Sequence, residues 1–302
     1  MYDSNVSEGN GYLTDLKFHN HQPLLYAVAK GMMRHKIRGG WRLFNLLAGI
    51  GYLKGKIIKY ELSEGYCVFV PIYRSERWDR VDLLTYEQDL IATLVNAALA
   101  CTGPITIVDC GADIGLISVL LAAQLRTVSK VVAFEPSDEA FPVLQKTLTE
   151  LPFETEALQV GLSDFTGQGE LRSPPYDGSQ HARYLVQVPE GGFLVTTVDA
   201  LSLKAVNLLL KIDVEGGEIG VIRGASRTLG EADKAIISVE AHPKVFGRTG
   251  VDPIVILREI AAIRPFQFTV AETGKADIDL TRPFFEQLPK DGTIYNIVCS
   301  SL

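Results

Sequence analysis

Two acidic residues and two glycines, set between apolar runs, are the part of the sequence best suited to chemistry. The run 107–110 is apolar and β-prone apart from Asp109, and a helical run follows the second glycine. We therefore expect a buried strand that turns directly into a helix. Gly111 lets the backbone in this turn adopt a conformation that other residues avoid, and Gly115 lets the start of the helix approach a ligand. The next apolar strand ends in the second acid, Glu135.

The order of acid, glycine turn, helix start and second acid offers complementary groups to one kind of ligand. Asp109 can accept hydrogen bonds from an amine or from hydroxyls, and Glu135 can bind a ribose diol. The free N–H groups at the start of the helix favour a carboxylate. S-adenosylmethionine carries a cationic sulfonium and amine, a carboxylate and a ribose. The order therefore predicts a site for this cofactor, and hence methyl transfer.

Two alternative functions use the same kind of fold. An NAD(P)-dependent oxidoreductase would also have a glycine turn and a second acid, but its fingerprint needs a third glycine where this turn has only Gly111 and Gly115. Asp109 would also lie close to a pyrophosphate and repel it. The other alternative is a non-catalytic binding protein with a methyltransferase fold. The presence of Asp109, Glu135 and Asp213 argues against it.

A second group of reactive side chains follows two later apolar strands, 206–213 and 235–241. If these strands are neighbours, about 4.8 Å apart, four side chains converge at their ends. These are Asp213, Glu215, Glu240 and His242. Such a group can supply a base or metal ligands. The alternatives are structural: Glu215 and Glu218 can favour the start of a helix, and His242 can be an ordinary loop residue.

Alternating strands and helices are expected to position both groups. The expected strands are 105–110, 131–135, 157–162, 206–213, 235–241, 266–271 and 293–300, and the expected helices are 86–100, 115–126, 138–150, 217–229 and 253–263. Strands separated by helical lengths predict a mainly parallel sheet with helices on both faces, which binds ligands at the carboxyl ends of its strands. We also expect a hairpin of 184–188 and 193–198 within an irregular section.

The first 80 residues form a separate part of the prediction. Residues 1–22 are polar and loose in character, and two helices (23–37 and 41–48) and a hairpin (56–62 with 66–72) are expected to follow. We interpret 1–80 as a small α+β accessory or capping segment and 81–302 as the cofactor-binding domain. The sequence shows no internal repeat and no low-complexity segment.

The net charge of −7 hides an uneven distribution. Residues 16–60 hold nine Lys and Arg and no acid, so the rest of the chain carries −16. Such asymmetry can mark an anionic partner. The hydrophobic content of 47% supports a substantial core. Four scattered cysteines, a polar start unlike a signal peptide and the lack of a membrane-length apolar run predict a cytoplasmic protein with reduced thiols and no transmembrane segment.

Six short stretches, in order, make the chain resemble the FkbM-type family of S-adenosylmethionine-dependent methyltransferases from about residue 86 to 300. They are Val108-Asp-Cys-Gly-Ala-Asp-Ile-Gly115, Ala133-Phe-Glu-Pro-Ser137, Gly161-Leu-Ser-Asp164, Val198-Asp-Ala-Leu201, Leu210-Lys-Ile-Asp-Val-Glu-Gly216 and Val239-Glu-Ala-His242. The resemblance implies a Rossmann-like class I methyltransferase fold with a seven-stranded, mostly parallel sheet whose last strand is antiparallel. It also implies O-methylation of sugars or natural products, for surface polysaccharide or secondary metabolism.

The resemblance implies roles for ten cofactor-binding residues. The methionine part would be held by Asp109, Gly111, Ala112 and Gly115, with Glu87 as an upstream acid near it, the ribose by Glu135, and the adenine by Pro136, Ser137, Ser163 and Asp164. One position departs from the family pattern, which usually has Asn where this chain has Asp113. An extra acid near the cofactor carboxylate is unfavourable unless it points away or pairs with a cation.

A sugar hydroxyl is a poor nucleophile, so we expect a base or a metal beside the acceptor. Asp213 and His242 are the residues that we assign to catalysis, with Glu240 and Glu215 in support. Mg²⁺ dependence stays open, and no residue is assigned as a metal ligand. The expected partner is a small-molecule or saccharide acceptor. If the acceptor carries a phosphate, the basic segment formed by residues 16–60 can attract it. We expect no nucleic-acid binding, because the chain is acidic and lacks such a motif. Whether the protein forms a homo-oligomer is left open.

Overall fold

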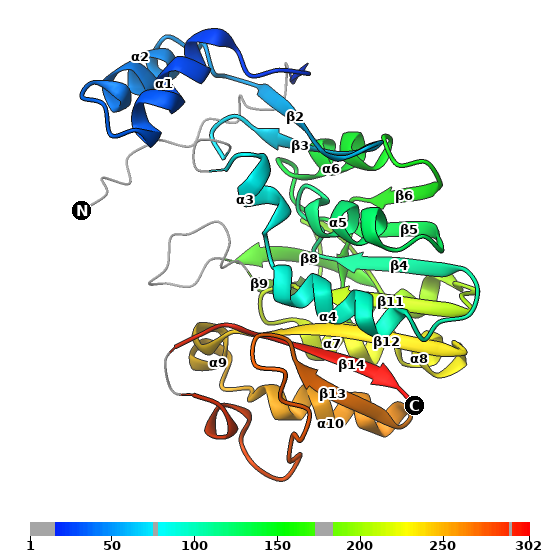
Figure 1. Cartoon of the computed structure of the whole chain (residues 1–302). Helices are drawn as coiled ribbons and strands as arrows, with labels where there is room; N and C mark the ends of the chain where they lie inside the picture. The colour runs from blue at the N-terminus through cyan, green and yellow to red at the C-terminus, as the bar shows by residue number, and fades with distance from the viewer. Residues whose placement is uncertain (1–15, 75–77, 173–183, 290–291) are drawn as a thin grey trace.

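The computed structural model describes residues 16–74, 78–172, 184–289 and 292–302, and its centre is a seven-stranded sheet (Figure 1). The strands, in their order across the sheet, are β13 (Phe266–Val270), β14 (Tyr295–Ser301), β12 (Lys234–Ala241), β11 (Asn207–Ile212), β4 (Ile105–Cys110), β5 (Val128–Phe134) and β6 (Glu154–Leu158). The strands from β12 to β6 pair in parallel, whereas β14 runs antiparallel to both of its neighbours. The prediction of a seven-stranded sheet is confirmed.

Helices cover both faces of this sheet, because successive strand residues point to opposite sides. Ile107 belongs to a core shared with α4 (Gln88–Ala98), α5 (Leu116–Gln124) and α6 (Phe141–Leu148). Val108 belongs to the core on the other face, shared with α7 (Glu218–Gly224), α8 (Ser226–Glu231) and α10 (Pro253–Ile263). The remaining helical segments here are α3 (Arg80–Leu84), α9 (Pro243–Thr249), and the short 3-10 turns η2 (Val198–Leu201) and η3 (Phe284–Gln287).

The single helix expected over 217–229 is wrong, because α7 and α8 are separate helices that divide at Ala225. The backbone at the division lies against a neighbouring chain segment. A Cβ atom on Gly224 would stand 2.1 Å from the carbonyl oxygen of Ser163. The helix therefore ends where it meets the segment that carries Ser163.

A second, four-stranded sheet has the order β7-β10-β8-β9, and it corrects two predictions. Its strands are β7 (Gly161–Leu162), β8 (Gly167–Arg172), β9 (Tyr184–Val188) and β10 (Phe193–Thr196). β9 and β10 are not paired with each other as a hairpin, since β8 lies between them. Likewise, the strand expected over 157–162 is divided between β6 and β7, which belong to different sheets.

The strand β8 escaped prediction because its centre is glycine rather than an apolar alternation. A Cβ on Gly169 would lie 2.5 Å from Leu185 Cδ1 and 2.8 Å from Val195 Cγ2. The side chains of β9 and β10 therefore close over the glycine from both neighbouring strands. The missing side chain is what lets β8 take the middle position.

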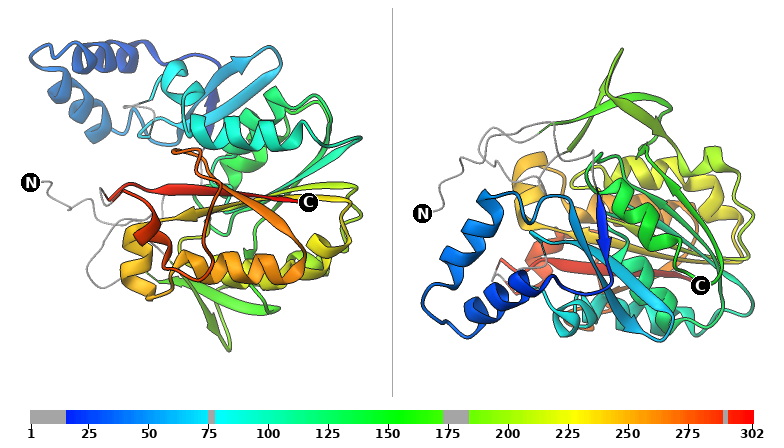
Figure 2. Two further views of the ribbon diagram at one scale, coloured as in Figure 1. Left: turned by 60° about the horizontal axis from the view of Figure 1, so that its bottom comes forward. Right: turned by 90° about the horizontal axis from the view of Figure 1, so that it is seen from above.

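The N-terminal elements form a third sheet and a pair of helices that projects from the body (Figures 1 and 2). They are β1 (Lys17–His19), α1 (Leu24–Arg34), α2 (Gly40–Gly49), β2 (Lys56–Ser63) and β3 (Tyr66–Pro71). Both predicted helices and the hairpin β2–β3 are confirmed, whereas β1 was not predicted and residues 1–15 lie outside the described part. β3 packs on α5 and α6, and the backbone N–H of Phe69 donates to Thr147 Oγ1 at 3.2 Å.

Two expectations drawn from composition can be compared with the structure. All four cysteines are free thiols, as the scattered spacing predicted. Among the helices of the described ranges, none is both long and apolar enough to cross a bilayer. The domain boundary near residue 80 stays a prediction, and one hydrophobic core includes residues from both sides of it, Leu53 and Val70 with Leu94 and Leu121.

Candidate active site

The glycine turn after β4 is shaped by packing against two neighbouring elements. Gly111 has a φ of +76°, and a Cβ there would lie 1.9 Å from the carbonyl oxygen of Asp213. Gly115 begins α5 with a φ of +83°, and its Cβ would meet Leu144 Cδ1 at 3.0 Å and Thr147 Cγ2 at 3.2 Å. The space beside Gly115 is thus taken by α6, so packing gives this glycine a structural reason, and its predicted approach to a ligand stays a prediction. Ala112, between them, is buried.

Lys211 is a buried cation that joins the ends of β4 and β11. Its Nζ donates to the carbonyl oxygen of Gly111 at 2.8 Å and lies 3.2 Å from Asp109 Oδ1 and 3.5 Å from Asp213 Oδ2. Burial alone would lower the pKa of Lys211, but the two carboxylates outweigh it and raise that pKa above its usual value. Asp109 is itself buried and accepts a hydrogen bond from Ser118 Oγ at 2.7 Å. Its carboxylate is therefore held from within the protein.

Glu135 follows β5 and is fixed by two backbone groups. Its Oε2 accepts from the N–H of Asp113 at 2.8 Å, and its Oε1 accepts from the N–H of Ser137 at 2.9 Å. Burial raises the pKa of the Glu135 carboxyl above its usual value. Pro136 and Ser137 lie partly exposed beside it, at the carboxyl end of the strand.

Ser163 and Asp164 follow β7 and lie against α7. The N–H of Ser163 donates to the carbonyl oxygen of Thr196 at 3.0 Å, and a Cβ on Gly220 of α7 would stand 2.7 Å from Ser163 Oγ. Asp164 is exposed and accepts from Ser163 Oγ at 3.4 Å. Within the described residues, neither has a hydrogen bond to Glu135. Their predicted place around an adenine stays a prediction.

The unusual acid Asp113 pairs with a cation, one of the two conditions under which its presence is tolerable. Both guanidinium nitrogens of Arg74 donate to it, Nη1 to Oδ1 at 2.8 Å and Nη2 to Oδ2 at 2.5 Å. Arg74 follows β3 and lies over the ring of Trp78, with 5.8 Å between the guanidinium carbon and the ring centre. The N-terminal part of the chain thus contributes directly to the turn. The sequence indicated that a cation was needed but could not say which one.

Three of the four predicted catalytic residues lie together. Carboxylate oxygens of Asp213, Glu215 and Glu240 are all within 4.8 Å of one another. The register explains this, because Ile212 of β11 pairs with Val239 of β12, and the residues that follow them are neighbours. Glu215 has a φ of +57° in the turn after β11. Glu218, by contrast, is buried at the start of α7 and accepts from the N–H of Gly216 at 2.8 Å, as its structural alternative predicted.

The protonation of Glu240 is governed by its surroundings. Burial, followed by the charges of Asp213 and Glu215, raises the pKa of Glu240 to about 8. A carboxyl group with this pKa can hold or release its proton near neutral pH. Proton transfer is most effective when the pKa of the group lies near the working pH.

His242 begins α9, a helix that the sequence did not predict. Its Nδ1 accepts from the backbone N–H of Lys244 at 3.0 Å, so in the neutral ring the proton sits on Nε2. Glu240, His242 and Phe246 line the same small cavity at the end of β12. In this tautomer His242 can donate a hydrogen bond to an acceptor molecule through Nε2. Taking up a proton at Nε2 first requires the tautomer to change.

Glu87 is held at the start of α4 by a residue far along the chain. Its Oε2 accepts from Asn296 Nδ2 at 2.8 Å, and Asn296 also donates to Glu272. Since Asn296 pairs with Glu240 in the β12–β14 ladder, Glu87 lies beside the acid group. Burial, with the charges of Glu87 and Asp213, raises the pKa of Tyr86 to about 12. The sequence reasoning missed five residues of this region, Arg74, Tyr86, Lys211, Glu272 and Asn296, which only the folded chain brings together.

Residues 109–267 match the methyltransferase FkbM domain. This match spans more than half of the chain and contains Asp109, Glu135 and the acid group at the ends of β11 and β12. The chain belongs to the FkbM methyltransferase family. The protein is accordingly a methyltransferase by family, and the alternative of hydride transfer is not supported.

Individual proteins give weaker likenesses. The chain is 26% identical over 194 residues to the hexuronic acid methyltransferase AglP of Haloferax volcanii, covering 63% of this chain and 74% of AglP. Against the FkbM methyltransferase of Methylobacillus flagellatus KT the identity is 20% and the TM-score 0.41, over 67% of this chain and 45% of that longer one. Against the plantazolicin methyltransferase BpumL, solved with SAH, the identity is 13% and the TM-score 0.38, over 74% of this chain and 86% of BpumL.

The Arg74–Asp113 pair can be tested without any ligand. In a double-mutant cycle with Arg74→Gln and Asp113→Asn, we expect the free energy of unfolding to show a coupling of about 0.5–2 kcal/mol, because the pair is bidentate and partly buried. The matched control is the single-contact pair Arg223–Glu259, for which we expect a smaller coupling. Equal couplings for the two pairs would contradict the special role of Arg74.

The raised pKa of Glu240 predicts a pH dependence of stability. Folded Glu240 keeps its proton up to about pH 8, whereas the unfolded residue loses it near its usual value of 4.5. Between these values the folded state binds more protons, so the free energy of unfolding falls as pH rises. We expect the free energy of unfolding of Glu240→Gln, relative to that of wild type, to rise by roughly 1–3 kcal/mol between about pH 4.5 and pH 8 and to stay constant above pH 8. Urea titrations with EDTA present measure this difference. A difference that does not vary with pH would show that the pKa is not raised.

Proposed function

We propose that the protein transfers a methyl group from S-adenosylmethionine to a hydroxyl oxygen of a saccharide or natural-product acceptor. The observation that carries this proposal is the convergence of Asp213, Glu215 and Glu240 within 4.8 Å, next to the glycine turn. Asp213 adjoins that turn directly, since its N–H donates to the carbonyl oxygen of Cys110 at 3.0 Å. The sulfonium is already an activated donor, so what the protein must add is alignment and a route for the hydroxyl proton.

The residues around the turn fit the cofactor chemically. Each carboxylate oxygen of Glu135 accepts one backbone hydrogen bond and retains the capacity to accept another, as binding of a ribose diol requires. We assign the methionine part to Asp109, Gly111, Ala112 and Gly115, with Glu87 near its amine. The adenine is assigned to Pro136, Ser137, Ser163 and Asp164. The acid group beside the turn favours the positive charge of the donor.

We propose that Asp213 is the general base that accepts the proton of the acceptor hydroxyl. The side chain of Asp213 is 43% exposed, so it can reach an acceptor. Its Oδ2 lies 3.5 Å from Lys211 Nζ, and this ion pair holds the carboxylate in place. Glu240, with its pKa near 8, can carry a proton at neutral pH and donate a hydrogen bond to the acceptor. His242 orients the acceptor by donating a hydrogen bond from Nε2–H, and Glu215 adds negative charge to the acid group. Each of the four residues therefore has a different role.

The same three carboxylates offer a second route to the same reaction. Mg²⁺ prefers oxygen ligands and is commonly held by one or two carboxylates together with water. A bound cation would neutralise the group and would favour the ionised form of an acceptor hydroxyl. A chelator separates the two routes, because only this one needs an added ion.

A saccharide acceptor is supported by the AglP relative, which its name describes as a hexuronic acid methyltransferase. Three of the basic residues in the stretch 16–60 have partners or are buried within the protein. Lys30 is buried, Arg34 pairs with Asp79, and Lys59 pairs with Glu150 at 2.6 Å. A phosphate on the acceptor therefore stays a proposal that relies on the remaining cations. The free cysteines are compatible with the cytoplasm, which we propose as the location.

The cofactor assignment predicts a selective loss of binding. Glu135→Ala should weaken the binding of S-adenosylhomocysteine by about 1–3 kcal/mol in calorimetry, because the ribose hydroxyls lose a buried partner. The matched control is Glu139→Ala, an exposed acid four residues away, which should bind like wild type. NAD serves as the negative ligand. Tight NAD binding without a response to S-adenosylhomocysteine would overturn the assignment.

The assignment of Asp213 predicts a loss of turnover without a loss of cofactor affinity. Asp213→Asn should lower methyl transfer to a saccharide panel by roughly 10²–10⁴-fold, the range for removing a general base. The control is Asp233→Asn, an exposed change just before the start of β12 and therefore at the amino ends of the parallel strands. Activity that EDTA removes and Mg²⁺ restores would assign the carboxylates to a metal instead. Full activity of Asp213→Asn would exclude the residue, and cofactor binding without any transfer would favour a binding protein.

A further inference from the structure

The helix pair α1–α2 exposes an unusual number of large apolar side chains. In α2 the exposed fraction is 51% for Trp41 and 59% for Leu46, and it is 66% for Ile50 at the end of this helix. In α1 it is 77% for Leu24. Leu25, Val28 and Ile37 are also exposed. Leu46 and Ile50 are four residues apart, as are Leu24 and Val28, so each pair lies along one stripe of its helix. Exposed apolar groups gathered on one element indicate an interaction surface.

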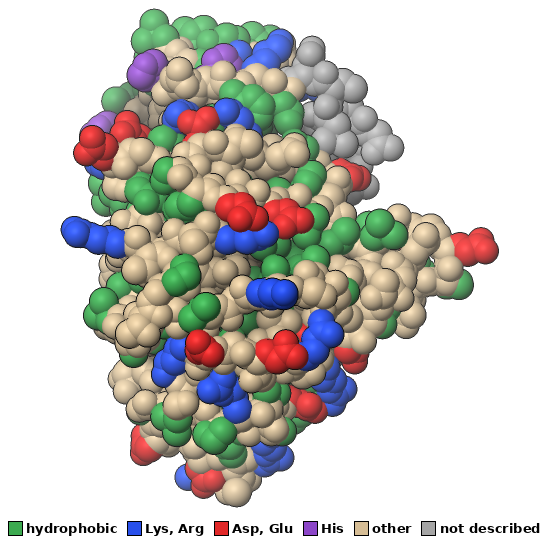
Figure 3. All heavy atoms as spheres, turned by 90° about the vertical axis from the view of Figure 1, so that its right-hand side faces the viewer, with side chains coloured by type: hydrophobic (Ala, Val, Ile, Leu, Met, Phe, Trp, Pro, Cys, Tyr) green, Lys and Arg blue, Asp and Glu red, His purple; other side chains and the backbone are tan. Residues whose placement is uncertain are grey.

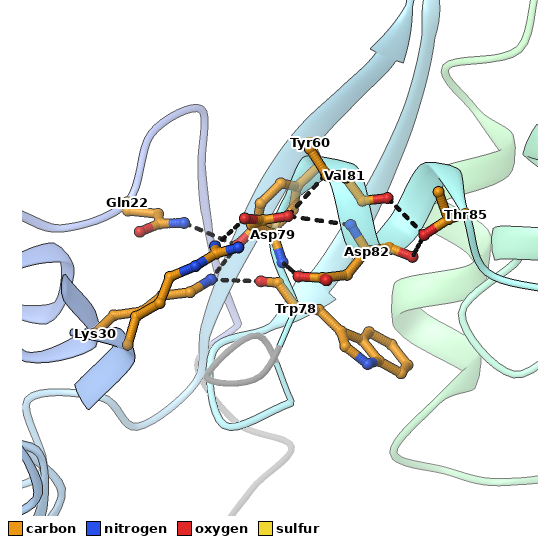
Figure 4. Close-up of polar contacts among 9 residues, drawn as sticks. Gln22, Lys30, Tyr60, Trp78, Asp79, Val81, Asp82 and Thr85 are labelled. Atoms are coloured by element: carbon orange, nitrogen blue, oxygen red, sulfur yellow. Dashed lines mark hydrogen bonds and ion pairs between the residues drawn. The ribbon is translucent and has the colours of Figure 1, made fainter. Parts of the chain in front are cut away.

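The helix pair is fixed to the body through two of its basic residues (Figure 4). Lys30 is buried and donates to the carbonyl oxygen of Trp78, and it lies 3.5 Å from the hydroxyl of Tyr60. Arg34 pairs with Asp79, which also accepts from the N–H of Val81 at 2.8 Å at the start of α3. These contacts anchor the inner side of the pair. The outer side is thus presented by a supported element.

Four other basic residues remain on the pair and its connections. They are Lys36, Arg38, Arg42 and Lys54, all exposed, and none has an ion pair with another described residue. No acid occurs between residues 16 and 60 to offset them. The face at the amino ends of the parallel strands differs, because acidic and basic side chains are interspersed there (Figure 3). The helix pair is therefore a local cationic, apolar surface on an acidic protein.

The position of the pair matches that of the candidate active site. In Figure 1 the pair projects at the upper left, on the side toward which β4 points and where the carboxyl ends of the parallel strands lie, and Figure 2 shows the same projection from two other directions. A flat partner that touches the pair on this side therefore faces the strand ends.

We propose that the outer side of α1–α2 binds the surface of a bilayer that carries anionic headgroups. Apolar side chains such as Trp41 and Leu46 enter the interface, and the four unpaired cations lie among the lipid phosphates. A second copy of this chain fits less well, because two such cationic surfaces repel each other. If the proposed function holds, an acceptor attached to a lipid meets the strand ends without leaving the membrane. Membrane binding itself does not depend on that function.

The test is vesicle flotation with the full chain and no cofactor. We expect binding to vesicles of phosphatidylcholine mixed with phosphatidylglycerol and little binding to phosphatidylcholine alone. Arg38→Gln/Arg42→Gln should weaken binding about fivefold for each charge removed, and salt should weaken the wild type. Arg126→Gln/Lys204→Gln, which removes two exposed charges elsewhere, should bind like wild type.

A second pair of variants tests the apolar part. Leu46→Gln/Ile50→Gln should weaken vesicle binding at least about tenfold, whereas Leu99→Gln/Leu302→Gln, whose leucines are 76% and 78% exposed elsewhere, should have no effect. Circular dichroism checks that each variant is folded. The proposal fails if wild type ignores anionic vesicles at low salt, or if helix-pair and control variants lose binding equally. It also fails if ultracentrifugation shows a dimer that Leu46→Gln/Ile50→Gln dissociates. Loss of methyl transfer in Asp213→Asn leaves these results unchanged, so the two proposals fail separately.

Discussion

The buried ammonium of Lys211 is the interaction on which the rest of the site depends. It is surrounded by the carbonyl oxygen of Gly111 and the carboxylates of Asp109 and Asp213, so one cation compensates two acids at adjoining strand ends. Removing such a cation would leave buried negative charge without a partner, which is strongly unfavourable. The contacts of Lys211 therefore join the glycine turn after β4 to the acid group after β11. The close contact of Gly111 with the backbone of Asp213 is the steric counterpart of this link.

The N-terminal part of the chain is joined to this arrangement rather than placed beside it. β3 packs on α5 and α6, and Arg74, three residues beyond the end of β3, pairs with Asp113 in the glycine turn. Asp113 in turn donates its backbone N–H to Glu135. A single line of contacts therefore runs from the N-terminal sheet to the residue that we assign to the ribose. Arg74 supplies the cation that the extra acid Asp113 needs in this turn.

The sequence predicted those parts of the molecule that depend on local pattern. Apolar strands ending in acids predicted the strand ends, and the parallel register of β11 and β12 then brought Asp213 and Glu240 together. Contacts between distant segments could not be read in the same way. Gly169 interrupts the apolar alternation of β8, and its reason is that side chains of β9 and β10 close over it. Lys211 can be buried within β11 because two acids, Asp109 and Asp213, lie beside its ammonium group. Gly115 is a third case, because the sequence pattern predicted a ligand beside it and the structure shows that packing on α6 also requires a glycine there.

The antiparallel strand β14 sets the order in which the protein can be completed. Asn296 of this strand holds Glu87, 209 residues earlier, and the strand fills the gap between β12 and β13. During synthesis the ribosome releases the glycine turn, the acid group and both neighbouring strands well before Asn296 emerges. A nascent chain therefore waits with an open strand edge on β12, which is exposed to pairing with other chains until translation of β14 ends. Among the described strands, β14 is thus the one that closes this edge of β12 and protects it from pairing with another chain.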